Sequence, residues 1–360
     1  MRTSVLLRWI SVGVAALASG CITAIDEADF PPGQRVTHCV TDVPATVRDG
    51  SGALSLEFAQ GDMWLFNETT IAVASGPMPL SNAGAVLSGT PECGATWPMI
   101  TDSSGRPRQI IPFTADEAAF NRDSAGTARI AIWPIGGFVH ENVGYVYFQK
   151  AVVRAFPDIT IIGVGLARIE WNGSARRLEA HRFAEEPTLL WRSPERSWGQ
   201  GAFIAPDGYV YLYGCGQNGG LTVDGAVARV RPEAAADPTA YRYYDVRNDR
   251  WIATPANAAT ILEDAGPASV AWSPFLNRFI AVYAANLSNA IAIRLADNPW
   301  GPFRTPRTLF SGDAPARFWI RDVQLHSGHF EENGRVLFLT YYSAPDGGAA
   351  GIRLVRYRLD

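Results

Sequence analysis

Two carboxylic acids near the start of the chain, Asp49 and Glu68, are the strongest candidates for chemistry. They flank a predicted β-hairpin whose strands are the apolar runs 53–58 and 63–66, joined by the turn 59–62. Because the open ends of an antiparallel hairpin lie together, we expect the two carboxyl groups to be neighbours. Two neighbouring carboxyl groups are the minimum equipment for cleaving a glycosidic bond.

The expected spacing of this pair favours one glycosidase mechanism. Adjacent strands lie about 4.7–4.9 Å apart, which is close to the roughly 5 Å between the carboxyl groups of retaining enzymes. Asp49 is then the nucleophile and Glu68 the general acid/base, with the pKa of Glu68 raised by the neighbouring negative charge. The alternative interpretation is a solvated pair of side chains at the mouth of a hairpin, with no catalytic role.

Six further residues are predicted to contact a sugar. Two histidines and one arginine lie at the ends of predicted strands and can hydrogen-bond to hydroxyl groups, and three aromatic residues offer rings for stacking. These residues are His140, His326, Arg321, Trp198, Tyr213 and Trp319. Each also has a structural alternative: a loop histidine with internal hydrogen bonds, an arginine paired with Asp322, or an aromatic ring in the core.

The elements that must position these residues are short β-strands. The chain has 34 glycines and 24 prolines, and only residues 114–121 resemble a helix. A turn residue followed by alternating aromatic and β-branched residues occurs five times, with another strand before most copies and an arginine-containing strand after most. The copies are 61–66, 144–148, 207–213, 277–283 and 333–339. This repeat predicts an all-β fold, a five-bladed β-propeller; independent hairpins in a two-sheet fold are the alternative.

The N-terminus has the pattern of a processing segment. Two arginines precede a short apolar run that ends in small residues before Cys21, which resembles a bacterial lipoprotein signal. We therefore expect a signal peptide at 1–20, lipidation of Cys21, a tether and N-terminal arm at 21–44, and the propeller at 45–360. The protein is then exported to the bacterial cell envelope, in the periplasm or at the cell surface, and held at the membrane only by its lipid. An ordinary secretory signal with a chance cysteine is the alternative.

The cysteine count limits the disulfides that can form, and the net charge limits the classes of binding partner. Export permits disulfides, and of the three remaining cysteines we choose Cys39–Cys93, which would tie the N-terminal arm to the first sheet and leave Cys215 free. A net charge of −4 without a Lys/Arg run gives no basis for nucleic-acid binding. We expect a monomer without a cofactor. A structural ion in the central channel is compatible with the fold, but no ligand set can be named.

Several segments together resemble a known family. They are Arg48–Ser51, Trp64–Thr69, Gly201–Ile204, Asp207–Tyr211, Ala228–Val230, Ala240–Tyr244, Trp251 and Arg294–Phe303. The resemblance covers about residues 45–360 and is to bacterial five-bladed propellers long described as a domain of unknown function. That family is now associated with endo-D-arabinanases, which cut the D-arabinan of mycobacterial-type cell walls. The resemblance implies a retaining glycoside hydrolase acting on a polysaccharide that contains arabinofuranose.

One departure from the family pattern concerns the candidate site itself. The family usually has Gly-Asp-Thr at the end of the second strand, whereas this chain has Asn67-Glu68-Thr69. The extra methylene of Glu68 moves its carboxyl group by about one carbon–carbon bond. The alternative function is therefore a non-catalytic propeller that binds glycans or envelope partners, and a purely structural scaffold is a third possibility.

Overall fold

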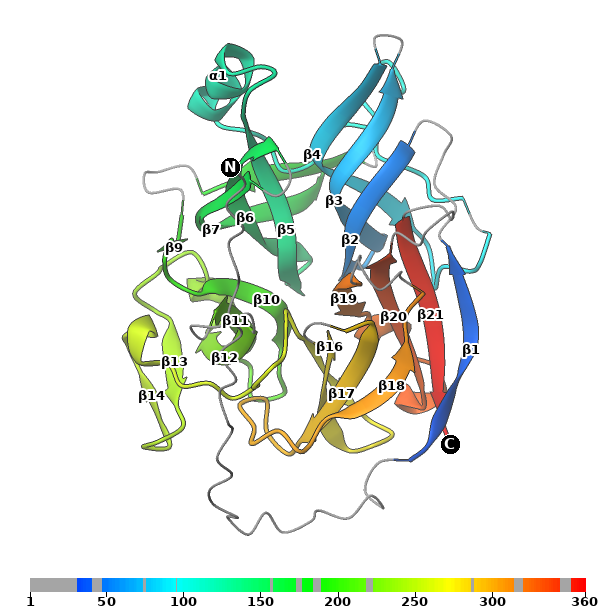
Figure 1. The fold of residues 1–360 in the computed structure, drawn as a ribbon, viewed down its shortest axis with the longest axis vertical. Helices are drawn as coiled ribbons and strands as arrows, with labels where there is room; N and C mark the ends of the chain where they lie inside the picture. Colours follow the sequence, from blue (N-terminus) through cyan, green and yellow to red (C-terminus); the bar gives the residue numbers. More distant parts are fainter. Residues whose placement is uncertain are drawn as a thin grey trace, which may run out of the picture. The chain divides into compact units, whose positions relative to one another are not determined.

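The computed structural model describes residues 31–40, 47–73, 76–94, 96–155, 158–172, 177–183, 189–217, 223–285, 288–313, 320–343 and 351–360. The chain divides into Met1–Pro31 and a compact unit, Pro32–Asp360. The compact unit is a five-bladed β-propeller, which confirms the fold that the repeat predicts (Figure 1). The predicted lipidation site Cys21 lies outside the described residues. No helix in the described ranges is long and apolar enough to cross a membrane.

Each blade is an antiparallel sheet. Blade 1 contains β2 (Val47–Phe58), β3 (Gly61–Val73) and β4 (Gly76–Leu87). Blade 2 contains β5 (Arg129–His140), β6 (Val143–Ala155), β7 (Asp158–Asn172) and β8 (Arg177–Arg182), with β9 (Trp191–Arg192) beside β7. Blade 3 contains β10 (Ser197–Ile204), β11 (Val210–Gln217), β12 (Val223–Val230), β13 (Arg242–Asp245) and β14 (Arg250–Ile252). Blade 4 contains β15 (Ser269–Ser273), β16 (Arg278–Ala284), β17 (Ala290–Ala296) and β18 (Arg307–Ser311). Blade 5 contains β19 (Arg321–Leu325), β20 (Val336–Ser343), β21 (Gly351–Leu359) and β1 (Gly33–Val40).

The first strand of each blade belongs to an inner ring around the propeller axis. β2 contacts β5 and β19, β10 contacts β5 and β15, and β15 contacts β19, so the five inner strands form a closed circle. Figure 1 shows the sheets arranged around this centre. Residues that lie far apart in sequence therefore meet at the axis.

The five sequence repeats are the second strands of the blades, namely β3, β6, β11, β16 and β20. These strands are covered by neighbouring blades on both faces; every residue of β20 is buried. A strand buried on both faces needs apolar residues at successive positions. This requirement explains why the second strand, and not the inner strand, carries the recognisable pattern.

The ring is closed by the N-terminal segment. β1 pairs with β21 as the outer strand of blade 5, so the propeller begins at Gly33, earlier than the boundary at residue 45 that the sequence suggests. Cys39 on β1 forms the expected disulfide with Cys93, with the two Cα atoms 5.9 Å apart. The bond links blade 5 to the segment after blade 1. Cys215 is the free cysteine among the described residues, and burial raises the pKa of its thiol to about 11.

The expected helix is α1 (Ala115–Asp123), whose N-terminus is capped by Thr114. Glu117 completes the capping box, is almost fully buried, and accepts hydrogen bonds from Arg182 of β8 while pairing with Lys150 of β6. The helix is thereby fixed to blade 2. It takes no part in the inner ring.

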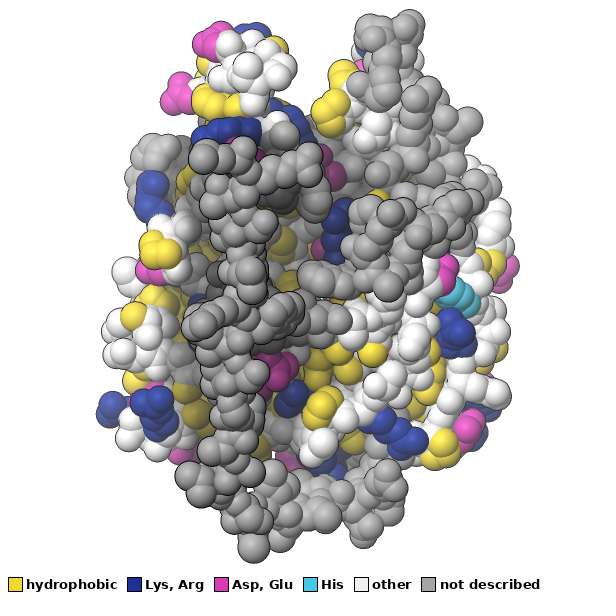
Figure 2. All heavy atoms as spheres, in the orientation of Figure 1, with side chains coloured by type: hydrophobic (Ala, Val, Ile, Leu, Met, Phe, Trp, Pro, Cys, Tyr) yellow, Lys and Arg dark blue, Asp and Glu magenta, His cyan; other side chains and the backbone are white. Residues whose placement is uncertain are grey.

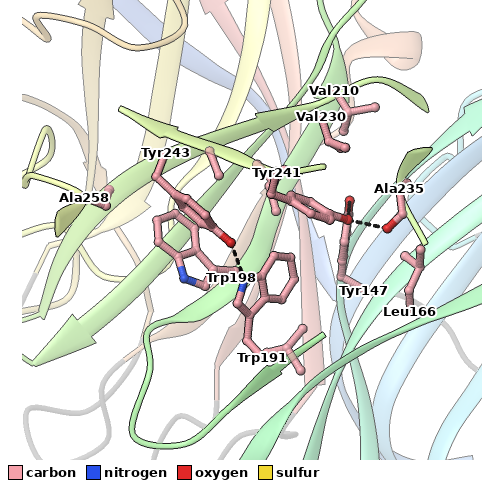
Figure 3. Packing of buried hydrophobic residues seen from close by; sticks show 14 of the residues in the cluster. Tyr147, Leu166, Trp191, Trp198, Val210, Val230, Ala235, Tyr241, Tyr243 and Ala258 are labelled. Carbon is pink, nitrogen blue, oxygen red and sulfur yellow. Dashed lines mark hydrogen bonds between the residues drawn. The ribbon is translucent and has the colours of Figure 1, made fainter. Parts of the chain in front are cut away.

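Aromatic side chains fill the space between blades 2 and 3 (Figure 3). The indole N–H of Trp191 donates to the hydroxyl of Tyr243 at 2.6 Å, and Tyr241 donates to the carbonyl of Ala235 at 2.5 Å. Trp198 packs against Trp191 and Tyr243 in the same cluster. These rings form a core in which most hydroxyl and indole N–H groups are hydrogen-bonded within the protein.

Candidate active site

Glu68 lies where the regular alternation of β3 breaks. Earlier in this strand, Trp64 and Phe66 pack toward blade 5, whereas Met63 and Leu65 pack toward blade 2. Side chains alternate between the two faces of a regular strand. Continued alternation would therefore direct Glu68 toward blade 5.

The structure turns Glu68 toward blade 2 instead. Its φ is +38°, and the pairing of β3 with β4 skips this residue between Asn67 and Thr69. The carboxylate accepts a hydrogen bond from Nη2 of Arg129 at 2.5 Å and another from the indole N–H of Trp133. A left-handed conformation costs about 1–2 kcal/mol for a residue with a side chain. Such strain is typical of functional sites.

Asp49 lies on the neighbouring strand β2, where its backbone is opposite Thr70. The position of its side chain lies outside the described part of the structure. Asp49 and Glu68 are therefore diagonal rather than directly opposed, and diagonal positions lie about 7–8 Å apart. The backbones of Asp49 and Glu68 are therefore farther apart than those of directly opposed residues.

A third carboxyl group, Asp322, occupies an unusual backbone position in the inner ring. Three inner strands contain a bulge with a left-handed residue: Gly52 in β2 (φ +63°), Gly201 in β10 (φ +55°) and Asp322 in β19 (φ +55°). Glycine adopts this conformation without steric cost. Blade 5 has a side chain at the position where blades 1 and 3 have none. Among the described strands, Glu68 and Asp322 are the non-glycine residues with positive φ.

The surroundings of Asp322 connect it to the strand that carries Asp49. Its carboxyl group accepts a hydrogen bond from the backbone N–H of Gly52 and lies 3.6 Å from Nε of Arg321. About a third of its side chain (30%) is accessible, but protein atoms enclose the carboxyl group, and this burial raises its pKa despite Arg321 and the Gly52 hydrogen bond. Asp322 thus holds β2 through a hydrogen bond at Gly52, three residues from Asp49.

The other predicted sugar-contacting residues are dispersed. Arg321 is half-exposed at the start of β19, above the ring of Tyr342 at 4.3 Å. His140 ends β5 beside the β5–β6 turn and is partly buried, so it belongs to the other half of the ring. Trp319 lies outside the described residues.

Three of these predicted residues are enclosed by the fold. Trp198 is 0% exposed and lies in the aromatic cluster drawn in Figure 3, and Tyr213 is 2% exposed and donates to the carbonyl of Pro299 at 2.6 Å. Neither ring presents a face to a sugar, because both lie in cores between blades. His326 is 1% exposed and hydrogen-bonded to Ser55 and Thr340, so its ring nitrogens are already satisfied internally.

Sequence reasoning missed Arg129 and Trp133 and gave Asp322 only a minor role. Nothing local in the sequence marks Arg129 or Trp133 as partners of Glu68, because they begin a different blade. A signal for Asp322 does exist: aligning the inner strands places it at the glycine of Gly52 and Gly201. The described residues contain no group of three or more His, Cys, Asp or Glu that could hold a metal ion.

Charged side chains give no sign of a polyanion-binding surface on the face drawn in Figure 2. There the described Lys and Arg side chains are interspersed with Asp and Glu rather than gathered into one patch. Binding to nucleic acid depends on a basic patch or stripe. The described part of this face has the mixed charge of an ordinary surface.

Comparison with known proteins supports the fold and gives a family match over part of the chain. Residues 168–325, from β7 to β19, match the family described as Domain of unknown function (DUF4185). This match confirms the resemblance to a propeller family of formerly unknown function, although it does not include Asp49 or Glu68. None of the curated proteins matches the sequence.

Two solved structures share the architecture. A protein from Bacteroides ovatus described as a "putative hydrolase" is 13% identical, with 87% of this chain and 86% of that chain covered and a TM-score of 0.60. A family 117 glycoside hydrolase from Zobellia galactanivorans is 10% identical, with 93% and 92% covered and a TM-score of 0.50. The chain therefore has a propeller fold that glycoside hydrolases also use. At these identities the similarity shows the fold alone.

Proposed function

We propose that this chain, a five-bladed propeller carrying a DUF4185 domain, is a retaining, endo-D-arabinanase-like glycoside hydrolase acting on an arabinofuranose-containing polysaccharide. The resemblance of its segments to the endo-D-arabinanase family supports the substrate. The descriptions of the two structural neighbours as hydrolases support the reaction class.

The conformation of Glu68 is the observation that carries this proposal. A strained backbone turns its carboxylate away from the direction that alternation dictates and toward Arg129 and Trp133. A residue with a purely structural role has no need of such strain, because a polar strand end can be solvated at no steric cost. The side chain remains partly exposed, at 28%, so a substrate can reach it.

The proposed reaction uses Asp49 and Glu68 in two steps. First, the Asp49 carboxylate attacks the anomeric carbon and the glycosidic C–O bond breaks, while the protonated form of Glu68 gives its proton to the leaving oxygen and becomes a carboxylate. Then Glu68 takes a proton from a water molecule, whose oxygen displaces Asp49 from the anomeric carbon. Asp322 acts as a positioning residue through its hydrogen bond to Gly52.

The decisive experiment is the variant Asp49→Asn, assayed on D-arabinan with chromatography of the products. We expect no hydrolysis, with the circular dichroism spectrum and thermal midpoint of the wild-type protein. Proton NMR of the first products of the wild-type enzyme should show retained anomeric configuration. Full activity of Asp49→Asn would exclude the assignment, and an inverted product would exclude the retaining mechanism.

A non-catalytic glycan-binding propeller is the second candidate. The ion pair between Glu68 and Arg129 favours it, because a carboxylate held by arginine can serve as a hydrogen-bond acceptor for a bound sugar without transferring a proton. This function predicts affinity for arabinogalactan without turnover. Incubation of purified protein with arabinogalactan, followed by product chromatography and a binding measurement, separates the two candidates.

We also propose that the protein is an exported, monomeric lipoprotein anchored through Cys21, a residue outside the described part of the chain. Lipidation would place the propeller beside its cell-wall substrate. Labelling cells with a fatty-acid analogue should mark the wild-type protein and not the Cys21→Ser variant. A labelled Cys21→Ser protein would contradict the anchor.

A further inference from the structure

The inner ring encloses a cavity that the proposed reaction does not use. It has a volume of about 320 Å³ and is lined by all five inner strands. Its walls come from the C-terminal halves of β2, β5, β10 and β19, together with β15. Asp49 lies at the other end of β2, eight residues from Glu57, which lines this cavity.

The polar groups that face the cavity are concentrated on blades 1, 4 and 5. Gln324 and Ser327, at the end of the inner strand of blade 5, have no hydrogen-bond partner for their side chains within the described structure. Glu57 is exposed and accepts one hydrogen bond, from the backbone N–H of Gly328. Ser269 accepts from the N–H of Leu325 and keeps its own hydroxyl proton to donate. Donors and acceptors therefore converge on one side of the space.

The remaining wall is apolar and aromatic. Phe138 on β5, Phe203 on β10 and Trp272 on β15 line it, and the indole N–H of Trp272 has no partner among the described residues. Trp272 also borders a second, smaller pocket with Trp300 and Phe279, of about 230 Å³. Aromatic rings opposite hydrogen-bonding groups match the two kinds of surface on a sugar, whose C–H face is apolar and whose edge carries hydroxyls.

The charge of the lining excludes several ligand classes. Among the described lining residues, Glu57 is the one ionisable group and there is no Lys or Arg, so an anion would be repelled. Although Glu57 as a whole residue is exposed, protein atoms surround its carboxyl group, and this burial and the nearby Asp62 raise its pKa, which weakens its attraction for a cation. The volume is at the small end of ligand pockets, which run from about 300 to 1,000 Å³, and it limits the occupant to one ring.

We propose that this channel cavity binds a single neutral sugar ring, held by Gln324, Ser327 and Glu57 against Phe203 and Trp272, at a site separate from Asp49 and Glu68. The site stands independently of the proposed hydrolysis, since none of its residues takes part in the two steps. It would let the propeller hold one sugar residue on the face opposite the site of cleavage.

Saturation-transfer NMR and isothermal titration with D-arabinose, L-arabinose and D-xylose test the proposal. We expect at least one pentose to bind wild-type protein, and Gln324→Leu or Trp272→Leu to weaken that binding about tenfold, as loss of one hydrogen bond or one stacking ring predicts. Gln34→Leu, the same replacement on an exposed residue of β1, is the matched control and should bind normally. Thermal midpoints verify that each variant is folded.

The double variant Asp49→Asn/Glu68→Gln separates this site from the proposed active site. It should bind the pentose with wild-type affinity although it hydrolyses nothing. Loss of binding in the double variant but not in Gln324→Leu would place the sugar at the other end of the ring and overturn the proposal. Absence of binding of all three pentoses to wild-type protein would do the same, leaving a channel that holds water only.

Discussion

The two halves of the inner ring are built from the same strands but differ in backbone. In the N-terminal half, β2, β10 and β19 are bulged, and left-handed residues include the carboxylic acid Asp322. Past these bulges the same strands pair in register and line an open cavity, which Gly201 of the β10 bulge also borders. Bulges re-aim side chains, whereas regular pairing fixes them. The comparison shows that this fold can place strained acidic residues at one end of its axis and a preformed cavity at the other.

The largest effect on activity is expected when the variant Glu68→Gln is compared with Glu57→Gln. Loss of a general acid/base typically lowers the rate by about 10²–10⁴-fold, so Glu68→Gln should lower kcat on D-arabinan to that extent. Glu57→Gln changes a carboxyl group in the cavity half and should leave kcat within about twofold, because it touches no reacting atom. Equal losses in both variants would remove the functional distinction between the two halves.

The next largest effect is expected on stability, when the disulfide at the seam between blades 5 and 1 is removed. The Cys39–Cys93 disulfide closes a loop of 54 residues across it, and a loop of this length stabilises the fold by about 4 kcal/mol through the entropy of the unfolded chain. A Cys39→Ser/Cys93→Ser variant should lose about that free energy of unfolding in urea titration. Since the Gly52–Asp322 and Gly328–Glu57 hydrogen bonds both join blades 1 and 5, hydrolysis and pentose binding should both weaken. An unchanged unfolding free energy would contradict the entropic account.

Asp322→Gly tests whether the strained acid serves function rather than stability. Glycine adopts the left-handed conformation freely, so the free energy of unfolding should stay the same or rise by up to about 1 kcal/mol. Loss of the hydrogen bond between Asp322 and Gly52 on β2 should nevertheless lower kcat, by about 10–100-fold if the Asp49 carboxylate shifts by roughly an ångström. Asn277→Gly, at a left-handed turn residue of blade 4, is the control and should leave kcat unchanged. Loss of stability with normal kcat would give Asp322 a structural role.

The smallest expected effect concerns His326, which lies behind the cavity wall. Burial and the positive charge of His329 lower the pKa of His326 well below 6.5, so the folded state keeps it neutral while the unfolded state binds a proton below that pH. Stability should therefore fall as pH drops below 6.5, by up to about 1.4 kcal/mol per pH unit. His326→Gln should be less stable than wild type at pH 7.5 yet lose less stability between pH 7 and 5. Thermal midpoints across this range measure the slope, and an equal slope in both proteins would contradict the assignment.

Much of the fold follows from local pattern. The five second strands, the short helix capped by Thr114 and the Cys39–Cys93 bond all appear in the structure as the sequence indicates. Strands buried on both faces leave long apolar signatures that a single sequence reveals. β1 was not recognised as part of the propeller, because an outer strand that is half-exposed has no such signature and its partner β21 lies at the other end of the chain.

The candidate site was predicted less completely. Asp49 and Glu68 are visible in the sequence because one hairpin contains both. Arg129 and Trp133 are not, because they reach Glu68 from another blade. Trp198 and Tyr213 were expected at a sugar-facing surface, but an aromatic residue in a strand looks the same whether it faces solvent or the next blade.

The amino-acid sequence by itself determined the class of fold, the number of blades and the acidic residues available for chemistry, since these depend on periodicity and residue type. Only the tertiary structure decided the backbone strain at Glu68 and Asp322, the partners that hold them, and the cavity at the axis. The physical reason is that closing five blades into a ring brings together residues separated by hundreds of positions. No local pattern records which of them will meet.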